Sequence, residues 1–196
     1  MGPREPASPD QDRVLVEAVL ARVPGAFEVL VRTYQGLCWR IVRRMVRDPE
    51  DARELCQETF LRVHRHLGQY RFESSLRSWL AQVAYSVAVR HLKRKRLRIV
   101  AFADNDAHDE MLTRIHDGFD LESAYADAEL VAHLRNAIEN LSPMQRTLLA
   151  MYYAENMSIG EIALVMRKPE GTVKSDLFRA RAALRVRLHA VVEKRG

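Results

Sequence analysis

The stretch that decides the fold covers residues 142–188 and reads SPMQRTLLAMYYAENMSIGEIALVMRKPEGTVKSDLFRARAALRVRL. Ser142 is followed by proline at the first helical position and by Gln145 at the third, which predicts a helix start closed by a capping box. Residues 158–161 repeat the signal sixteen positions later. The Lys-Pro-Glu-Gly run at 168–171 predicts where the second helix ends, because proline and glycine interrupt helices.

A third helix is expected from Thr172. Its apolar positions recur every three or four residues, the period of a helix with one buried face. These positions are Val173, Leu177, Ala180, Leu184 and Leu188. The residues off this stripe are mostly cationic or polar: Lys174, Ser175, Phe178, Arg179, Arg181, Arg185 and Arg187. Two short helices with a tight turn, the second one basic, predict a DNA-binding helix-turn-helix. A solvated basic helix in a three-helix bundle is the alternative.

Composition limits the class of protein. The chain has 196 residues, of which 47% are hydrophobic and 29% charged, enough for one domain or two small ones. A net charge of +5 favours a polyanionic partner. No apolar run approaches the roughly 20 residues of a transmembrane helix, so we expect a cytoplasmic protein without membrane insertion.

Cys38 and Cys56 sit in apolar helical patterns and are interpreted as small buried hydrophobes. No cofactor or metal is expected.

The first part of the chain predicts three helices after a proline-rich tail. Asp10 or Asp12 is expected to cap the first helix, residues 26–46 form the second, and Asp48 caps the third, which covers residues 50–67. The third helix carries a compact acidic and amide face made of Asp51, Glu54, Gln57 and Glu58. That face is either a solvated helix start favoured by the helix dipole or a docking surface for a basic partner.

A fourth helix is expected after a loop at residues 69–75, with Ser74 or Ser75 as its cap. It leads into residues 90–98, where six of nine side chains are Lys or Arg, a density that favours phosphate contacts. Arg71, Phe72 and Trp79 lie just before this run. Aromatic rings interleaved with cations suit single-stranded nucleic acid, although a tryptophan at helical spacing is often simply core.

The sign of the charge reverses in residues 103–129. Nine acidic residues and one arginine give this segment a net charge of −8, so the rest of the chain carries +13. Such a composition predicts a linker, with a helical turn near residues 111–115. A leading helix at residues 123–140 should then precede the Ser142 cap.

We therefore expect an all-α fold of two small helical domains. The expected boundaries are a flexible tail at 1–9, a first domain at 10–98, an acidic linker at 99–122 and a second domain at 123–196.

With both domains in view, the chain resembles the extracytoplasmic-function (ECF) sigma factors of the sigma-70 family, which are bacterial transcription initiation subunits. Three motifs carry the resemblance: DARELCQETF at 51–60, Ser78-Trp79-Leu80, and GTVKS at 171–175 followed by FRAR at 178–181. They occur in this order, with a linker where the family has one. The resemblance covers about residues 12 to 190.

The resemblance implies a role for each surface. The first domain would be sigma-2, with Asp51, Glu54, Gln57 and Glu58 docking on the β′ clamp of core RNA polymerase. Its minus-10 surface, which melts promoter DNA and captures a base, would be Arg71, Phe72, Trp79, Ser86, Arg90 and Lys93. The second domain would be sigma-4, at the β flap, with Thr172, Lys174, Ser175, Phe178 and Arg179 facing the minus-35 element. An anti-sigma factor is an implied partner, and recruitment to a membrane through it stays open.

Three positions depart from the family pattern. Ser86 replaces a usual Asn, Arg90 stands where an acid or amide is common, and Asp176 replaces a usual Arg. An acid at position 176 would repel a phosphate, or it could accept a hydrogen bond from a cytosine amino group. We expect these changes to bear on promoter choice more than on fold.

Two other classes of function remain as alternatives. A stand-alone helix-turn-helix regulator would bind DNA without polymerase, but it leaves the acidic face and the acidic linker unexplained. A nucleic-acid enzyme is disfavoured, because the sequence shows no nucleophile with its base, metal-ligand cluster or glycine-rich phosphate loop.

Overall fold

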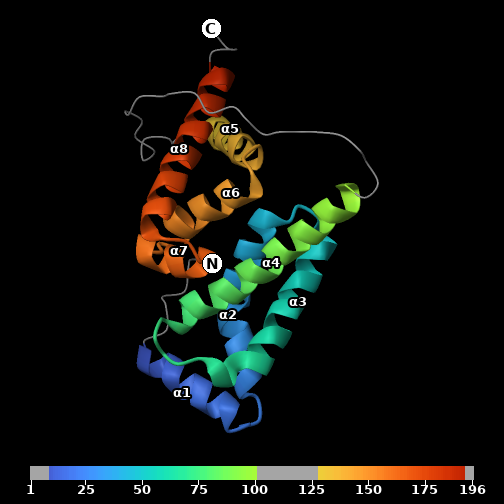
Figure 1. Ribbon diagram of the computed structural model, residues 1–196, viewed down its shortest axis with the longest axis vertical. Helices are drawn as coiled ribbons and strands as arrows, with labels where there is room; N and C mark the ends of the chain where they lie inside the picture. The colour runs from blue at the N-terminus through green and yellow to red at the C-terminus, as the bar shows by residue number, and fades with distance from the viewer. Residues whose placement is uncertain (1–8, 101–127, 193–196) are drawn as a thin grey trace.

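A computed structural model describes residues 9–100 and 128–192 of the chain. Within these ranges the backbone is helical and contains no strand, which confirms the all-α prediction. The helices form two modules, shown in blue to green and in yellow to red in Figure 1. The expected acidic linker lies almost wholly outside the described residues, as do the predicted turn at 111–115 and the tail up to residue 8.

The first module consists of four helices. They are α1 (Pro9–Leu20), α2 (Ala26–Met45), α3 (Pro49–His66) and α4 (Leu76–Val100), with a short 3₁₀ turn, η1 (Leu67–Gln69), between the last two. Helices α2, α3 and α4 pack against one another and α1 crosses one end of α2 (Figure 1). Their shared core is fully buried and apolar, with Leu30, Ile41, Met45, Val63 and Leu80 at its centre.

Side-chain caps fix where these helices start. The Asp48 carboxylate accepts hydrogen bonds from the amides of Glu50 and Asp51 at 2.8 and 2.9 Å, as predicted. The Ser75 hydroxyl accepts from the Ser78 amide at 3.1 Å, which settles the cap of α4 in favour of Ser75. These bonds satisfy amides that have no partner inside the helix.

Helix α1 differs from the expectation. Asp10 and Asp12 lie within its first turn rather than ahead of it, because the helix already begins at Pro9. Asp12 is buried, and its carboxylate accepts a hydrogen bond from the Tyr34 hydroxyl of α2. Burial raises the pKa of Asp12, and the bond from Tyr34 opposes that rise. Asp12 therefore ties α1 to α2 instead of capping a helix.

The second module consists of α5 (Ala128–Glu139), α6 (Pro143–Leu149), a π-helical turn η3 (Ala150–Ala154), α7 (Ile159–Met166) and α8 (Glu170–Val192). Both predicted capping boxes are present, at Ser142 with Gln145 and at Ser158 with Glu161. Helix α8 starts two residues before the expected Thr172, because the Pro169 carbonyl already accepts from the amides of residues 172 and 173.

The apolar stripe predicted for α8 is confirmed. Val173, Leu177, Ala180 and Leu184 are buried, and Leu188 packs partly buried against the core. Because α8 contacts α5, α6 and α7, this stripe is the surface around which the second module assembles.

The two modules are in contact with each other. Helix α7 packs against α4, and α6 packs against α2 (Figure 1). The buried guanidinium of Arg146 takes part, since it donates to the carbonyl oxygens of Arg44 at 2.9 Å, Glu139 at 2.9 Å and Leu141 at 3.1 Å. The sequence analysis did not predict this contact.

Replacing Arg146 tests how much the contact contributes to stability. Arg146→Met should lower the free energy of unfolding by about 3 kcal/mol, because it leaves three carbonyl oxygens without their charged donor. Arg32→Met is the matched control: Arg32 pairs with Glu28 on the exposed face of α2, where ion pairs contribute roughly 0.5 kcal/mol. Denaturant unfolding followed by circular dichroism measures both, and equal losses would show that Arg146 has no special structural role.

Candidate nucleic-acid interface

The helix-turn-helix is formed by α7, the turn after it and α8. Arg167 ends α7 in the left-handed conformation, with a φ of 54°, and its amide bonds back to the carbonyls of Ala163 and Leu164. Pro169 directly precedes α8, and its carbonyl accepts the first hydrogen bonds of that helix. The chain changes direction sharply over residues 167–169, and the N-terminal half of α8 keeps an exposed face.

The outward face of α8 carries the residues expected to meet DNA. Those residues are exposed: Thr172, Lys174, Ser175, Phe178 and Arg179. Phe178 is 57% exposed and places an apolar ring on the same face. The helix thus separates a buried apolar stripe from an accessible cationic face, as a helix that enters a major groove must.

Asp176 forms ion pairs with two of the cations on this surface. Its carboxylate accepts one hydrogen bond from the Lys168 ammonium and one from the Arg179 guanidinium, each at 2.6 Å. Partial burial raises the pKa of Asp176, but the bonds from Lys168 and Arg179 outweigh it, so the pKa lies below its usual value. Arg179 is therefore held against its own helix. The i,i+3 spacing of Asp176 and Arg179 could have indicated this pair, which the sequence analysis missed.

Arg181 also has a partner within the module. Its guanidinium lies over the rings of Tyr152 and Tyr153, 5.3 and 5.4 Å from their centroids. It stacks on the π-helical turn, which separates it from the exposed cations nearer the start of α8.

In the first module, the loop before α4 presents an aromatic cluster. Phe72 is 37% exposed, and its ring centroid lies 4.7 Å from that of Tyr70. The Arg13 guanidinium lies over the Phe72 ring, 4.7 Å from the ring centroid. The Trp79 ring is 5.4 Å from Tyr70 and partly buried. Arg71 is exposed beside them. Trp79 is thus part of the packing and also part of the cluster that reaches the surface.

Helix α4 continues this surface toward its basic end. Arg90 and Lys93 are exposed, and Ser86 is half-buried with its hydroxyl donating to the Val83 carbonyl at 2.9 Å. Ser86 and Arg90 are one helical turn apart and therefore lie on one side of the helix. The structure brings the expected residues of α4 onto a shared cationic face.

The acidic face of α3 is divided in two. Glu54 and Gln57 are exposed, and the half-buried Glu58 accepts from Arg62 at 2.6 Å, a bond that lowers the pKa of Glu58. Asp51 instead lies beside α4, 3.4 Å from His91 and 3.5 Å from Lys95. Glu54, Gln57 and Glu58 form the accessible acidic face, and Asp51 links α3 to the basic end of α4.

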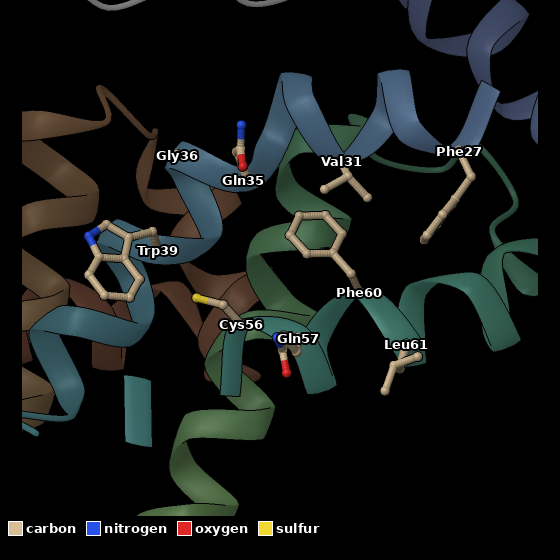
Figure 2. Close-up of a pocket in the computed structure, with 9 residues that line it drawn as sticks. All are labelled: Phe27, Val31, Gln35, Gly36, Trp39, Cys56, Gln57, Phe60 and Leu61. Carbon is tan, nitrogen blue, oxygen red and sulfur yellow. The ribbon is translucent and has the colours of Figure 1, made fainter. Parts of the chain in front are cut away.

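Beside this acidic face lies an apolar groove between α2 and α3, shown in Figure 2. It has a volume of about 690 Å³ and is lined mainly by aromatic and aliphatic side chains, including Phe27, Val31, Trp39, Phe60 and Leu61. Gln57 belongs to both the groove and the acidic face. The sequence analysis did not predict the groove. A signal was present, because α2 has more apolar residues than one buried stripe needs, and the additional ones line the groove.

The two cysteines behave as small hydrophobic residues. Cys38 is buried and Cys56 is partly buried, and both are free thiols. Burial raises the pKa of Cys56 to about 11 and that of Cys38 further, so neither is a reactive thiolate at neutral pH. Across residues 9–100 and 128–192, no cluster of His, Cys, Asp and Glu could hold a metal ion. Nor is any described helix long and apolar enough to cross a membrane.

Comparison with protein families matches both modules. The sigma-70 region 2 family matches residues 30–98, and the sigma-70 region 4 family matches residues 133–184. The first match includes all of α3 and most of α2 and α4, and the second includes α7 and the first part of α8.

Full-length relatives show the same likeness. The RNA polymerase sigma-H factor of Pseudomonas aeruginosa is 36% identical over 179 residues, covering 89% of this chain and 92% of the relative. The ECF RNA polymerase sigma-E factor of Haemophilus influenzae is 30% identical over 177 residues, covering 87% and 91%. Among solved structures, CnrH in complex with the cytosolic domain of CnrY has a TM-score of 0.63 at 21% identity, covering 91% of this chain and 97% of that one. That structure shares the fold.

The Asp176 ion pairs predict a gain of DNA affinity when the acid is removed. Asp176→Asn should release Lys168 and Arg179 and remove a negative charge from the outward surface. Nonspecific affinity for duplex DNA should rise, and the slope of log K against log salt should steepen by about 0.9 for each cation newly placed on phosphate. Fluorescence anisotropy over a salt series measures both quantities, with Glu28→Gln on α2 as the charge-matched control. An unchanged slope for Asp176→Asn would mean that the freed cations do not face DNA.

Proposed function

Because the chain belongs to the ECF sigma factors of the sigma-70 family, we propose that it binds core RNA polymerase and directs it to specific promoters, contributing recognition and no catalysis of its own. The observation that carries this proposal is the pairing, in one chain, of a region 2 module and a region 4 module that each present a cationic helix to solvent.

We assign minus-35 recognition to the second module. Lys174, Ser175 and Arg179 lie on the exposed face of α8, where polar and cationic side chains can reach base edges and phosphates in the major groove. Thr172 at the start of the helix is placed for a phosphate, since helix N-termini favour anions. Phe178 supplies apolar contact on the same face.

Minus-10 recognition is assigned to the first module. Phe72 and Trp79 offer ring faces on which unpaired bases can stack, and Arg71 lies beside them. Arg90 and Lys93 continue the positive surface along α4 and suit the backbone of a separated strand. With Ser86 between these two groups, a flipped base would meet a hydroxyl in place of the usual Asn amide.

Polymerase docking is assigned to the acidic face of α3. Glu54, Gln57 and Glu58 form an accessible surface that is complementary to a basic helical partner such as the β′ clamp. Asp51 would act at the edge of this surface, because it already contacts His91 and Lys95. Contact between the second module and the β flap of core polymerase is assigned through family resemblance alone.

Tethering explains why two small modules suffice. Contacts of this electrostatic kind give dissociation constants of only about 10⁻⁴ to 10⁻⁶ M at physiological salt. Two weak sites carried by one polymerase gain affinity through effective concentration. A stand-alone regulator would need tight binding from α8 alone, and it would have no use for the acidic face.

An anti-sigma factor is the proposed negative regulator. The structural neighbours include CnrH with the cytosolic domain of CnrY and, from Bartonella quintana, the sigma factor RpoE with the anti-sigma factor NepR, which has a TM-score of 0.61 at 20% identity and covers 84% of this chain and 98% of that one. We propose a partner of this kind for this chain, acting in the cytoplasm, where core polymerase is found.

Arg179 provides a test of base recognition. Arg179→Ala should cost roughly 1 to 3 kcal/mol of holoenzyme binding at promoters with the preferred base and should relax preference at that position. Competition binding of holoenzyme to single-base promoter variants measures this. An equal loss of affinity on every promoter sequence would instead indicate that Arg179 contacts a phosphate.

Charge reversal tests the docking face. Glu54→Lys combined with Glu58→Lys should abolish association with core polymerase, because two attractive contacts become repulsive, while the helical circular dichroism spectrum stays unchanged. Glu17→Lys combined with Glu139→Lys makes the same charge change at exposed sites on α1 and α5. Co-purification with core polymerase is the readout. Retention of the Glu54/Glu58 variant at the control level would refute docking through this face.

A further inference from the structure

Helix α1 brings a cation to the aromatic cluster in the loop before α4. The Arg13 guanidinium lies over the Phe72 ring, 4.7 Å from the ring centroid. The Phe72 centroid lies 4.7 Å from that of Tyr70, and the Tyr70 centroid lies 5.4 Å from that of Trp79. Two segments that are far apart in the sequence thus form one series of ring contacts that ends at Arg13.

Contacts inside the module fix the position of Arg13. The neighbouring Asp12 is buried, and its carboxylate accepts a hydrogen bond from Tyr34 on α2. Helix α1 also contacts η1, from which the chain continues into the loop that carries Phe72. Because Asp12 and Arg13 are successive residues of one helix, anchoring the first holds the backbone of the second beside the loop.

Phe72 adopts a backbone conformation that bulky residues rarely take. Its φ is 59°, which lies in the left-handed region and is strained for a residue with a Cβ atom. The side chain is nevertheless 37% exposed, so full burial of the ring is not what compensates for this strain. Residues held in such conformations cluster at binding sites. The exposed ring suits a ligand that brings a flat apolar surface of its own.

The Arg13 side chain is available to an anion. It is exposed, and no carboxylate among residues 9–100 and 128–192 forms an ion pair with it. A ring offers no oxygen acceptor, so its contact with Phe72 leaves the N–H donors of the guanidinium free to bind an anion or water. Guanidinium groups pair well with phosphate because their donors form a planar fork.

A separated DNA strand supplies both partners that Phe72 and Arg13 lack. Any unpaired base can stack on an aromatic ring, and cationic side chains follow the phosphates beside it. In a duplex the faces of each base are covered by its neighbours, so only the phosphate remains for binding. A ring with an adjacent cation therefore favours a separated strand over a duplex.

We propose that Arg13 extends the minus-10 surface onto α1 by binding the phosphate next to the base that stacks on Phe72. This inference rests on the proposed function, which assigns Phe72 to the minus-10 strand and leaves α1 without a contact to DNA. In the free protein the guanidinium covers part of the Phe72 ring. When a base takes that place, the guanidinium exchanges the ring for the phosphate.

The test measures DNA binding by the full-length chain assembled with core polymerase, with core polymerase alone as the baseline. The probes are fluorescent pools of short random-sequence DNA, one single-stranded and one duplex, and anisotropy is followed over a salt series. Arg13→Gln should weaken single-strand binding roughly two- to fivefold, the range for one exposed charge pair. It should also reduce the slope of log K against log salt by about 0.7, the value for one phosphate of a single strand.

Two further variants separate charge from packing. Arg13→Lys keeps the charge but not the planar group, and it should keep the salt slope of the parent. Arg22→Gln removes the same charge from an exposed site in the turn after α1 and should leave both the single-strand affinity and the slope unchanged. Circular dichroism checks that each variant keeps its helices.

A double-mutant cycle tests whether Arg13 and Phe72 act on the same nucleotide. Phe72→Ala should weaken single-strand binding about fivefold or more, because a stacking surface is lost. The double variant Arg13→Gln with Phe72→Ala should lose less than the product of the two single losses, since contacts that share one ligand group are coupled. A loss equal to that product would overturn the shared site.

The remaining outcomes also decide the proposal. Arg13→Gln with the affinity and salt slope of Arg22→Gln would overturn it, as would equal losses on the single-stranded and duplex pools. A lowered slope that Arg13→Lys does not restore would leave Arg13 with a packing role alone and would likewise overturn the proposal. Co-purification of the parent with core polymerase is measured separately. Its failure would refute the proposed function, and the same variants would then be compared on the chain alone at low salt.

Discussion

Each of the two long helices, α4 and α8, must bury one apolar face and leave a cationic face in water. On α8, Val173, Leu177 and Ala180 supply the buried face, and Lys174 and Ser175 stand between them on the other side. Burial of the apolar stripe is the main source of stability for so small a module. The cationic face contributes little to folding and is therefore available for DNA. The division of the helix into two faces is what makes a small bundle usable as a recognition surface.

The contact between modules adds charged groups to an apolar core. One buried apolar cluster runs through both modules. At the contact between them, Glu155 pairs with Arg40 and Arg77, and Arg146 donates hydrogen bonds to backbone carbonyls. A buried polar group is costly unless it finds such partners, so these pairs determine which residues can meet at the contact.

Local features were predictable from sequence because short-range chemistry determines them. The caps at Asp48, Ser142 and Ser158 and the stripe of α8 are confirmed. Long-range contacts were not predictable from helical periodicity. Glu155 gave no local signal, since its partners lie 115 and 78 residues away in sequence. Aspartate is a common helix cap, but Asp12 is buried and accepts a hydrogen bond from Tyr34 instead. Tertiary packing here overrides the local preference. The roles assigned to individual DNA-facing residues rest on family resemblance and exposure together.

The central claim is that this chain acquires promoter specificity only as part of RNA polymerase. The most direct measurement is run-off transcription with purified core polymerase and a library of promoter templates, followed by sequencing of the templates that yield RNA. The account predicts transcripts from a defined subset of templates, sharing sequence near minus 35 and minus 10, only when the chain is added. Absence of transcripts from every template, or transcripts that do not depend on template sequence, would contradict it.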